Sequence, residues 1–256
     1  MSIPMFSFVN NVAVITGGRM GIGKAIALAL AEAGADVVVS DLVVEGGELE
    51  AVAEQIRGLG QRSLALQTDI GKKADVDNMV RRVMEEFGRI DVLVNNAAIR
   101  SSVPLLELSE DEWDEVIDTD LKGYFFCCQA AGKIMVKQKK GNIISMSSKA
   151  AIRVGQRGGN VYGIAKAGVI MLTRALAQEL ASYNIRVNAI APSTVRTDFT
   201  RNLWSNPERL DQYVATVPLG RIAEASDIVG ATLYLASDAS SYITGQTIVV
   251  DGGSSG

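Results

Sequence analysis

Short apolar runs alternate with longer amphipathic segments along the whole chain. The runs are rich in Val and Ile and are apolar throughout, which predicts strands buried on both faces of a parallel sheet. The longer segments place apolar residues at helical spacing, which predicts helices. The predicted strands cover residues 9–15, 36–40, 63–67, 91–94, 142–146, 185–190 and 247–250, and the predicted helices cover 24–33, 45–58, 72–87, 109–137, 160–183 and 226–236.

This alternation of strands and helices predicts an α/β fold. We expect a Rossmann-type, doubly wound, mostly parallel seven-stranded sheet with helices on both faces, in a three-layer αβα sandwich. No linker, repeat or low-complexity segment interrupts the chain, so a single domain is expected over 1–256. The stretch 193–221 is polar and irregular, with a short helix expected near 207–214, and is the predicted substrate-loop region. Ligands of such folds bind beyond the carboxyl ends of the strands, so every loop that follows a strand lies on the functional edge.

Composition narrows the class of protein. The net charge is −4 and the basic residues are scattered, which argues against nucleic-acid binding. No uncharged apolar run is long enough to span a membrane, and the first residues lack the pattern of a signal peptide. The only cysteines, Cys127 and Cys128, are adjacent in a predicted helix, where they cannot form an ordinary disulfide with each other. We therefore expect a cytoplasmic protein with no nucleic-acid or membrane partner.

The absence of histidine excludes several kinds of catalytic site. Without it the chain cannot form a Ser-His-Asp triad or a Cys-His pair. Zinc sites that need histidine are excluded as well, and two cysteines cannot form a four-cysteine site, so no metal is expected. The chemistry must therefore depend on Tyr, Lys, Ser, carboxylates or a bound cofactor.

A glycine-rich loop containing Gly17, Gly21 and Gly23 follows the first predicted strand. Glycines there permit a tight turn and a close approach of the backbone to a pyrophosphate, which the N-terminus of the next helix attracts. The spacing differs from the common Gly-x-Gly-x-x-Gly fingerprint, and a simple connecting turn is the alternative. The order of strand, loop, helix, strand and acid favours a dinucleotide site.

The acid in that order is Asp41, at the end of the second predicted strand. A carboxylate about twenty residues beyond the glycines can accept a hydrogen bond from the adenosine ribose and would repel a 2′-phosphate. Leu42 offers no cation for such a phosphate. NAD is therefore the expected cofactor and NADP is less favoured; Arg19, in the glycine loop, is the one residue that argues for NADP.

Tyr162 and Lys166 are four residues apart in the predicted helix 160–183, so their side chains share one face. An ammonium beside a phenol favours the phenolate and lowers the pKa of the tyrosine, which would make Tyr162 a general base. The alternative is an ordinary helix with a surface Lys and a half-buried Tyr. Ser147 and Ser148 follow a predicted strand and so lie on the same functional edge.

The sequence resembles the short-chain dehydrogenase/reductase family over essentially the entire chain, as far as Asp251-Gly-Gly253. The residues that carry the resemblance are, in order, Thr16-Gly-x-x-x-Gly-Ile-Gly23, Asn95-Asn-Ala-Ala98, Ser148 and Tyr162-x-x-x-Lys166. The resemblance implies that Tyr162 is the general acid/base and that Lys166 holds the nicotinamide ribose and lowers the tyrosine pKa. It implies that Ser148, rather than Ser147, orients the substrate oxygen. It also implies a homotetramer built partly from the helices 109–137 and 160–183.

The resemblance further implies a set of cofactor contacts. Asp69 matches the position that contacts adenine, Asn95 the position near the adenosine ribose, and Thr197 the residue that receives the nicotinamide carboxamide. The full expected set is Gly17, Arg19, Met20, Gly21, Ile22, Gly23, Asp41, Leu42, Asp69, Ile70, Asn95, Ala97, Tyr162, Lys166, Pro192, Val195 and Thr197.

Three positions depart from the family pattern. Asp120, in Asp120-Leu-Lys-Gly123, stands where the family has an Asn that holds a water of the proton relay. An Asp can also hold a water, but it adds a titratable charge near Lys166, so we expect Asp120 to take part in catalysis with an altered pH response. Ala98 and Ser193 replace family glycines, and neither change removes a chemical group.

These observations predict an NAD-dependent oxidoreductase that interconverts a secondary alcohol (a sugar, polyol, hydroxyacid or cyclic alcohol) and its ketone. The expected substrate contacts are Ser148, Arg153, Arg157 and Tyr162, and the pocket loops also carry Arg100, Arg196 and Arg201. Such arginines could bind an anionic group of the substrate or could simply face water. The alternatives are a 3-oxoacyl thioester ketoreductase and, from another class, a non-catalytic dinucleotide-sensing or scaffold protein.

Overall fold

The computed structural model describes residues 4–154 and 160–255, and its centre is one seven-stranded sheet in which every neighbouring pair of strands is parallel. The strand order is β3-β2-β1-β4-β5-β6-β7. The strands are β1 (Val12–Thr16), β2 (Asp36–Asp41), β3 (Ser63–Gln67), β4 (Val92–Asn95), β5 (Gly141–Met146), β6 (Ile185–Pro192) and β7 (Thr247–Val250). The expected Rossmann-type sheet is confirmed, and it is parallel throughout.

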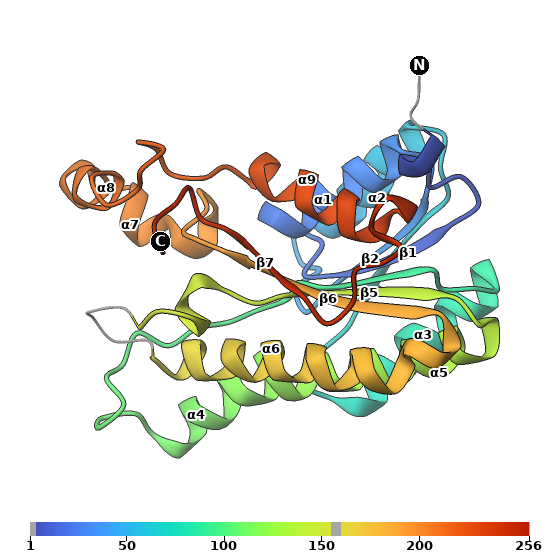
Figure 1. The fold of residues 1–256 in the computed structure, drawn as a ribbon, viewed down its shortest axis with the longest axis horizontal. Helices are drawn as coiled ribbons and strands as arrows, with labels where there is room; N and C mark the ends of the chain where they lie inside the picture. The colour runs from blue at the N-terminus through green and yellow to red at the C-terminus, as the bar shows by residue number, and fades with distance from the viewer. Residues whose placement is uncertain (1–3, 155–159, 256) are drawn as a thin grey trace.

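Helices cover both faces of this sheet and complete three layers (Figure 1). On one face lie α1 (Gly21–Glu32), α2 (Glu48–Gly58) and α9 (Ala225–Ala236), and on the other lie α3 (Lys73–Phe87), α4 (Glu110–Ile117), α5 (Tyr124–Gln138) and α6 (Asn160–Leu180). Each face has its own buried apolar cluster, because strands apolar on both faces bury residues against both helix layers. Two further helices, α7 (Arg201–Trp204) and α8 (Pro207–Val214), lie in the segment that follows β6.

The strand order reverses between β1 and β4, because the chain passes from β1 to β3 on one side and then crosses to the other. A crevice opens at such a point beyond the carboxyl ends of the two strands. The glycine loop follows β1 and the loop that begins at Asn96 follows β4, so the fold brings these two segments together. The backbone N–H groups of Asn96 and Ala97 both donate to Thr16 Oγ1, at 3.0 and 3.2 Å.

The predicted helix 109–137 is helical without a break from Glu110 to Gln138, but it is not α-helical throughout. Ser109 caps its start with a capping box, as expected, but a π-helical segment, Asp118–Gly123, separates α4 from α5. A π segment fits one more residue into a turn and changes which side chains face inward. At Gly123 an added Cβ would lie 2.9 Å from the carbonyl oxygen of Ile70, so the backbone packs too closely here for a larger residue. The result is that Asp120 is fully buried.

Other boundaries differ from the prediction by a few residues. Helix α1 begins at Gly21 rather than at residue 24, so the glycine loop itself starts the helix. Helix α2 begins at Glu48 rather than at 45, because Gly46 and Gly47 have φ values of +89° and +76°, which a helix does not allow. No helix among the described residues is long and apolar enough to cross a membrane.

Candidate active site

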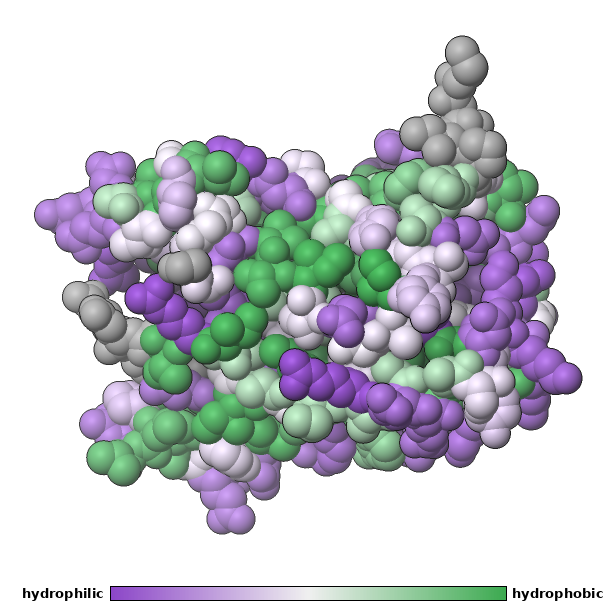
Figure 2. Space-filling model, viewed as in Figure 1, coloured by the Kyte–Doolittle hydropathy of each residue, from purple (hydrophilic) through white to green (hydrophobic). Residues whose placement is uncertain are grey.

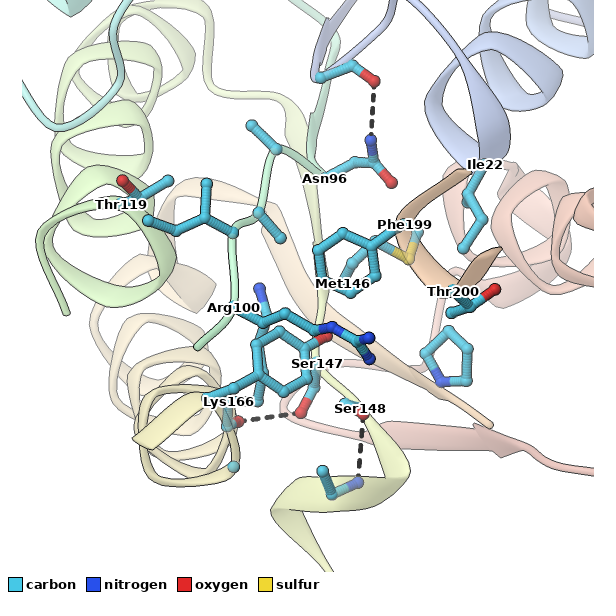
Figure 3. A pocket seen from close by; sticks show the side chains of 18 of the residues that line it. Ile22, Asn96, Arg100, Thr119, Met146, Ser147, Ser148, Lys166, Phe199 and Thr200 are labelled. Atoms are coloured by element: carbon cyan, nitrogen blue, oxygen red, sulfur yellow. Dashed lines mark hydrogen bonds between the residues drawn. The ribbon is translucent and has the colours of Figure 1, made fainter. Parts of the chain in front are cut away.

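A cavity of about 1080 Å³ lies where the loops after β1, β2, β4, β5 and β6 meet (Figure 3). Of the residues that the sequence nominates, it is lined by Gly17, Arg19, Met20, Gly21, Ile22, Asp41, Leu42, Asp69, Ile70, Ala97, Ser148, Arg153, Tyr162, Lys166, Pro192, Val195 and Thr197. Gly23, Asn95 and Asp120 do not line it, and Arg157 lies outside the described residues. A space of this size, with polar groups converging from several loops, is typical of a site for a small molecule or cofactor.

Two glycines of the loop are required by close backbone contacts. Gly17 has φ +65°, and a Cβ on it would lie 2.7 Å from the Cα of Ala97. A Cβ on Gly23 would lie 2.1 Å from the carbonyl oxygen of Gly17, so Gly23 packs against the backbone of the glycine loop. It does not line the cavity. The Asn96 amide donates to the carbonyl oxygens of Thr16 and Gly17 and fixes the loop against the segment after β4.

The N-terminus of α1 opens onto the cavity without a cap from the protein. Met20 precedes the helix and gives no side-chain cap, and Met20, Gly21 and Ile22 all line the cavity. The first N–H groups of a helix have no partner within it and attract anions. A pyrophosphate therefore fits this end of the cavity, as the sequence predicts.

Asp41 stands at the end of β2 with its carboxylate fixed in place. Its Oδ1 accepts a hydrogen bond from Val43 N at 3.1 Å, and its side chain is 15% exposed. Arg19 Nε lies 3.7 Å from Asp41 Oδ1, and Arg19 Nη1 lies 3.3 Å from Glu48 Oε2. The guanidinium of Arg19 is therefore balanced by two carboxylates.

Tyr162 lies in the first turn of α6, which packs closely on the segment after β5. A Cβ on Gly163 would lie 2.8 Å from the carbonyl oxygen of Ala150, so only a glycine lets the helix approach this far. The two serines after β5 differ in role. Ser147 is buried and its hydroxyl donates to the Lys166 carbonyl at 2.9 Å, whereas Ser148 Oγ accepts from Ala150 N at 3.1 Å and lies in the cavity beside Tyr162 (Figure 3).

Lys166 makes two buried contacts on its side away from the cavity. Its Nζ lies 3.3 Å from Asp120 Oδ2 and 3.0 Å from the hydroxyl of Tyr124. Lys166 is 1% exposed, and Asp120 and Tyr124 are fully buried. The other oxygen of Asp120 accepts a hydrogen bond from Ile99 N at 2.9 Å. Burial raises the pKa of Asp120 and lowers that of Lys166, while their mutual attraction opposes both shifts.

The expected lowering of the tyrosine pKa by Lys166 is wrong for this arrangement. Burial raises the pKa of Tyr162 well above its usual value, and the charge of Asp120 raises it further. The groups that lower the pKa of Tyr162 are the hydrogen bond from Ser148 and the charge of Arg100. Lys166 Nζ is 5.5 Å from the centre of the Tyr162 ring, but Asp120 offsets its charge.

The arginines of the pocket loops divide into two groups. Arg196 pairs with Glu224 at 3.0 Å and Arg201 pairs with Asp198, and neither lines the cavity. Arg153 lines it and donates to the Ser254 carbonyl at 3.3 Å. Arg100 lines it too, with its guanidinium carbon 5.4 Å from the centre of the Phe199 ring.

Comparison with known proteins decides the family. A family model described as Enoyl-(Acyl carrier protein) reductase matches residues 17–255. The 3-oxoacyl-[acyl-carrier-protein] reductase FabG of Staphylococcus epidermidis is 43% identical over 244 residues, which cover 95% of this chain and 98% of that protein. The chain belongs to the short-chain dehydrogenase/reductase family. As a member it is a nicotinamide-dependent oxidoreductase of CH–OH groups with a Tyr/Lys catalytic pair, and Tyr162 and Lys166 match the spacing of that pair.

Solved structures of other short-chain dehydrogenases/reductases have the same fold. The short-chain type dehydrogenase/reductase from Mycobacterium marinum superposes with a TM-score of 0.94 at 37% identity, with 98% of each chain covered. The gluconate 5-dehydrogenase from Burkholderia cenocepacia, solved in complex with NADP and tartrate, superposes with a TM-score of 0.93 at 32% identity, covering 98% of this chain and 97% of that one.

The sequence pattern misses Tyr124 and does not separate Arg100 from the other loop arginines. Tyr124 contacts Lys166 although it reads as an apolar position of the helix; its spacing of four residues from Asp120 is the signal that places both on one face. Arg100 was grouped with the other loop arginines, and only its contact with Phe199 separates it from them. Asn95 is fully buried and donates to Ser145 Oγ at 3.1 Å, whereas its neighbour Asn96 lines the cavity.

Proposed function

We propose that this protein interconverts a secondary alcohol and its ketone by hydride transfer to and from NAD, with Tyr162 as the general acid/base. One observation carries the proposal: Ser148, Tyr162 and Lys166 line the same cavity as the open N-terminus of α1 and Asp41. The nicotinamide supplies the hydride chemistry when it is bound, and the residues of the chain bind, orient and move the proton.

Each of these residues has a separate task. In the oxidation direction Tyr162 accepts the proton of the substrate hydroxyl, and in reduction it returns a proton to the carbonyl oxygen. Ser148 donates a hydrogen bond to that same oxygen and favours the charge that develops on it. Lys166 would hold the ribose of a bound nicotinamide cofactor, and its contacts with Asp120 and Tyr124 fix the position of its ammonium.

The proposed cofactor is NAD rather than NADP. Asp41 supports this preference, because its fixed carboxylate at the end of β2 suits two ribose hydroxyls and repels a 2′-phosphate. Arg19, which argued for NADP, is engaged with Asp41 and Glu48. The structure of the Burkholderia cenocepacia relative contains NADP, so the test must compare both cofactors directly.

A second candidate function is the reduction of a 3-oxoacyl thioester. The curated relatives support it more directly than they support the small secondary alcohols, because proteins 43% identical over nearly the whole chain are 3-oxoacyl-[acyl-carrier-protein] reductases. The B. cenocepacia gluconate 5-dehydrogenase, at 32% identity, supports the hydroxyacid reading instead. Both candidate reactions use the same hydride and proton transfers. They differ in the substrate, which is a small alcohol or ketone in one case and a 3-oxoacyl thioester in the other.

The decisive experiment follows NADH and NADPH absorbance with a panel of secondary alcohols, sugars, hydroxyacids, their ketones and an acetoacetyl thioester. We expect turnover with NAD(H) in the wild type and almost none in Tyr162→Phe, with NADH binding retained because the ring remains. Turnover that survives in Tyr162→Phe would contradict the role of Tyr162. Nucleotide binding without turnover of any substrate would favour the dinucleotide-sensing alternative.

We also propose a cytoplasmic homotetramer. The buried free thiols Cys127 and Cys128 suit a reducing compartment. Large apolar side chains are exposed on α5 and α6, namely Phe125, Ile164 and Met171, and Val249 of β7 is exposed as well. Figure 2 shows apolar residues gathered on the face that carries α9 and β7. Such patches are typical of interaction surfaces. Light scattering after gel filtration measures the oligomeric state directly.

A further inference from the structure

Arg100 brings a positive charge into the catalytic end of the cavity. Its guanidinium carbon lies 5.4 Å from the centre of the Phe199 ring, and the Phe199 ring lies 5.9 Å from the ring of Tyr162. Figure 3 shows the Arg100 side chain extending across the cavity toward Phe199 and Ser148. The guanidinium carbon is within cation–π distance of the ring, and the guanidinium N–H groups can still donate to another partner.

No ion pair joins Arg100 to a carboxylate among residues 4–154 and 160–255, in contrast to Arg196 and Arg201. Glu115 also lines the cavity, and it forms no ion pair with Arg100. The position of Arg100 is therefore that of a cation held in place by an aromatic ring and not by an acid. A charge placed in this way can bind an anion that enters the cavity.

Lys166 cannot supply this charge. Its ammonium lies 3.3 Å from the buried carboxylate of Asp120, so the two charges cancel and the ion pair attracts a substrate anion only weakly. The other described arginines of the lining are engaged elsewhere, because Arg153 donates to the carbonyl of Ser254 and Arg19 pairs with Asp41 and Glu48. Lys149, which also lines the cavity, donates to the hydroxyl of Ser254. Among the described cations of the lining, Arg100 is therefore the one that forms no side-chain hydrogen bond or ion pair within the protein, and its charge is one of the two influences that lower the pKa of Tyr162.

We propose that Arg100 binds a carboxylate of the substrate, so that the protein acts on hydroxy acids and the corresponding oxo acids whose carboxylate lies close to the reacting carbon. This inference rests on the proposed function and narrows its substrate class. A carboxylate matches the two parallel N–H donors of a guanidinium edge, whereas a neutral ester or thioester offers a weaker acceptor. A short 3-oxo acid carries a charged carboxylate where its thioester carries a neutral group, so Arg100 would favour the acid.

The test compares each acid with its own neutral ester. The values of kcat/KM for acetoacetate, ethyl acetoacetate, pyruvate, methyl pyruvate and an acetoacetyl thioester are measured with NADH in the wild type, Arg100→Met, Arg100→Lys and Arg196→Met. Arg196 is the matched control, because it is a loop arginine paired with Glu224 outside the cavity. Expressing the result as the acid-to-ester ratio cancels any general effect of a variant on hydride transfer.

We expect the wild type to prefer the acids, and we expect Arg100→Met to reduce the acid-to-ester ratio by about tenfold to a hundredfold, as for a lost charge-assisted pair. Arg100→Lys should restore part of the ratio, and Arg196→Met should keep it. A wild type that prefers the esters or the thioester, or a ratio unchanged in Arg100→Met, would overturn the inference.

A binding measurement separates this inference from the proposed function. The protein with NAD⁺ is titrated calorimetrically with acetoacetate, a mixture in which no hydride transfer occurs because both compounds are oxidised. Saturable binding in the wild type that Arg100→Met weakens at least tenfold supports the carboxylate site even if no member of the panel is turned over. Absent binding, or equal binding in both proteins, overturns it whatever the fate of the proposed function.

Discussion

Lys166 Nζ lies 3.3 Å from Asp120 Oδ2, and both side chains are buried. The ion pair forms where the family pattern has a neutral Asn, so it changes the charge next to Lys166. A buried charge without a partner is costly, which makes each member of this pair dependent on the other. The hydroxyl of Tyr124, 3.0 Å from the same Nζ, completes the buried contacts of Lys166.

Asp120→Asn should remain active and should shift the pH–rate profile to lower pH. The charge of Asp120 raises the pKa of both Tyr162 and Lys166, so its removal lowers both. Oxidation needs deprotonated Tyr162 and protonated Lys166, so Tyr162 sets the acidic limb and Lys166 the basic limb of the pH profile of kcat/KM for the alcohol. Both limbs should therefore shift to lower pH. Asp118→Asn, which breaks a surface pair with Lys122, is the control. Complete loss of turnover would instead give Asp120 a specialised role.

Tyr124→Phe should destabilise the protein by about 1–3 kcal/mol, because the buried Lys166 ammonium loses an acceptor while the ring volume is kept. The KM for the cofactor should rise more than kcat falls, since Lys166 is held less firmly. Thermal unfolding and initial rates measure the two effects. Tyr242→Phe, at a fully exposed ring, should change neither quantity. Equal behaviour of the two variants would exclude a positioning role for Tyr124.

Ser148→Ala and Ser147→Ala should fail in different ways. Loss of the Ser148 hydroxyl removes a hydrogen bond to the reacting oxygen and should lower kcat by about 10²–10³-fold with the fold intact. Loss of the Ser147 hydroxyl leaves the buried carbonyl of Lys166 without this donor and should cost about 1–3 kcal/mol of stability. The kcat of Ser147→Ala should fall much less than that of Ser148→Ala. The opposite order of kcat values would exchange the roles of the two serines.

Asp41→Asn should reduce discrimination against NADP. Removal of the carboxylate removes the repulsion of a 2′-phosphate and frees Arg19 from one of its two acidic partners. We expect the NADP-to-NAD ratio of kcat/KM to rise by about tenfold or more, a change of about 1.4 kcal/mol in relative transition-state stabilisation. Adding Arg19→Met should cancel much of this gain. An unchanged ratio in Asp41→Asn would mean that cofactor choice lies elsewhere.

The sequence by itself determined the order of strands and helices, because runs of apolar residues and helical spacing are local patterns. It also placed Ser148, Tyr162, Lys166 and the glycine loop on one edge, since every loop after a parallel strand lies there. The fold confirms the sheet, and the cavity brings these residues together.

Only the tertiary structure decided which charges meet. The π segment Asp118–Gly123 packs closely on Ile70, and the fold brings Asp120 and Tyr124 to Lys166 across more than forty residues of sequence. The pKa of Tyr162 is raised because burial and the charge of Asp120 outweigh the hydrogen bond from Ser148 and the charge of Arg100, which no spacing in the sequence reveals. Arg100 likewise becomes distinct from the other loop arginines only through Phe199, whose ring is brought to it by the chain beyond β6. Such contacts depend on how distant segments pack, and local pattern carries no information about them.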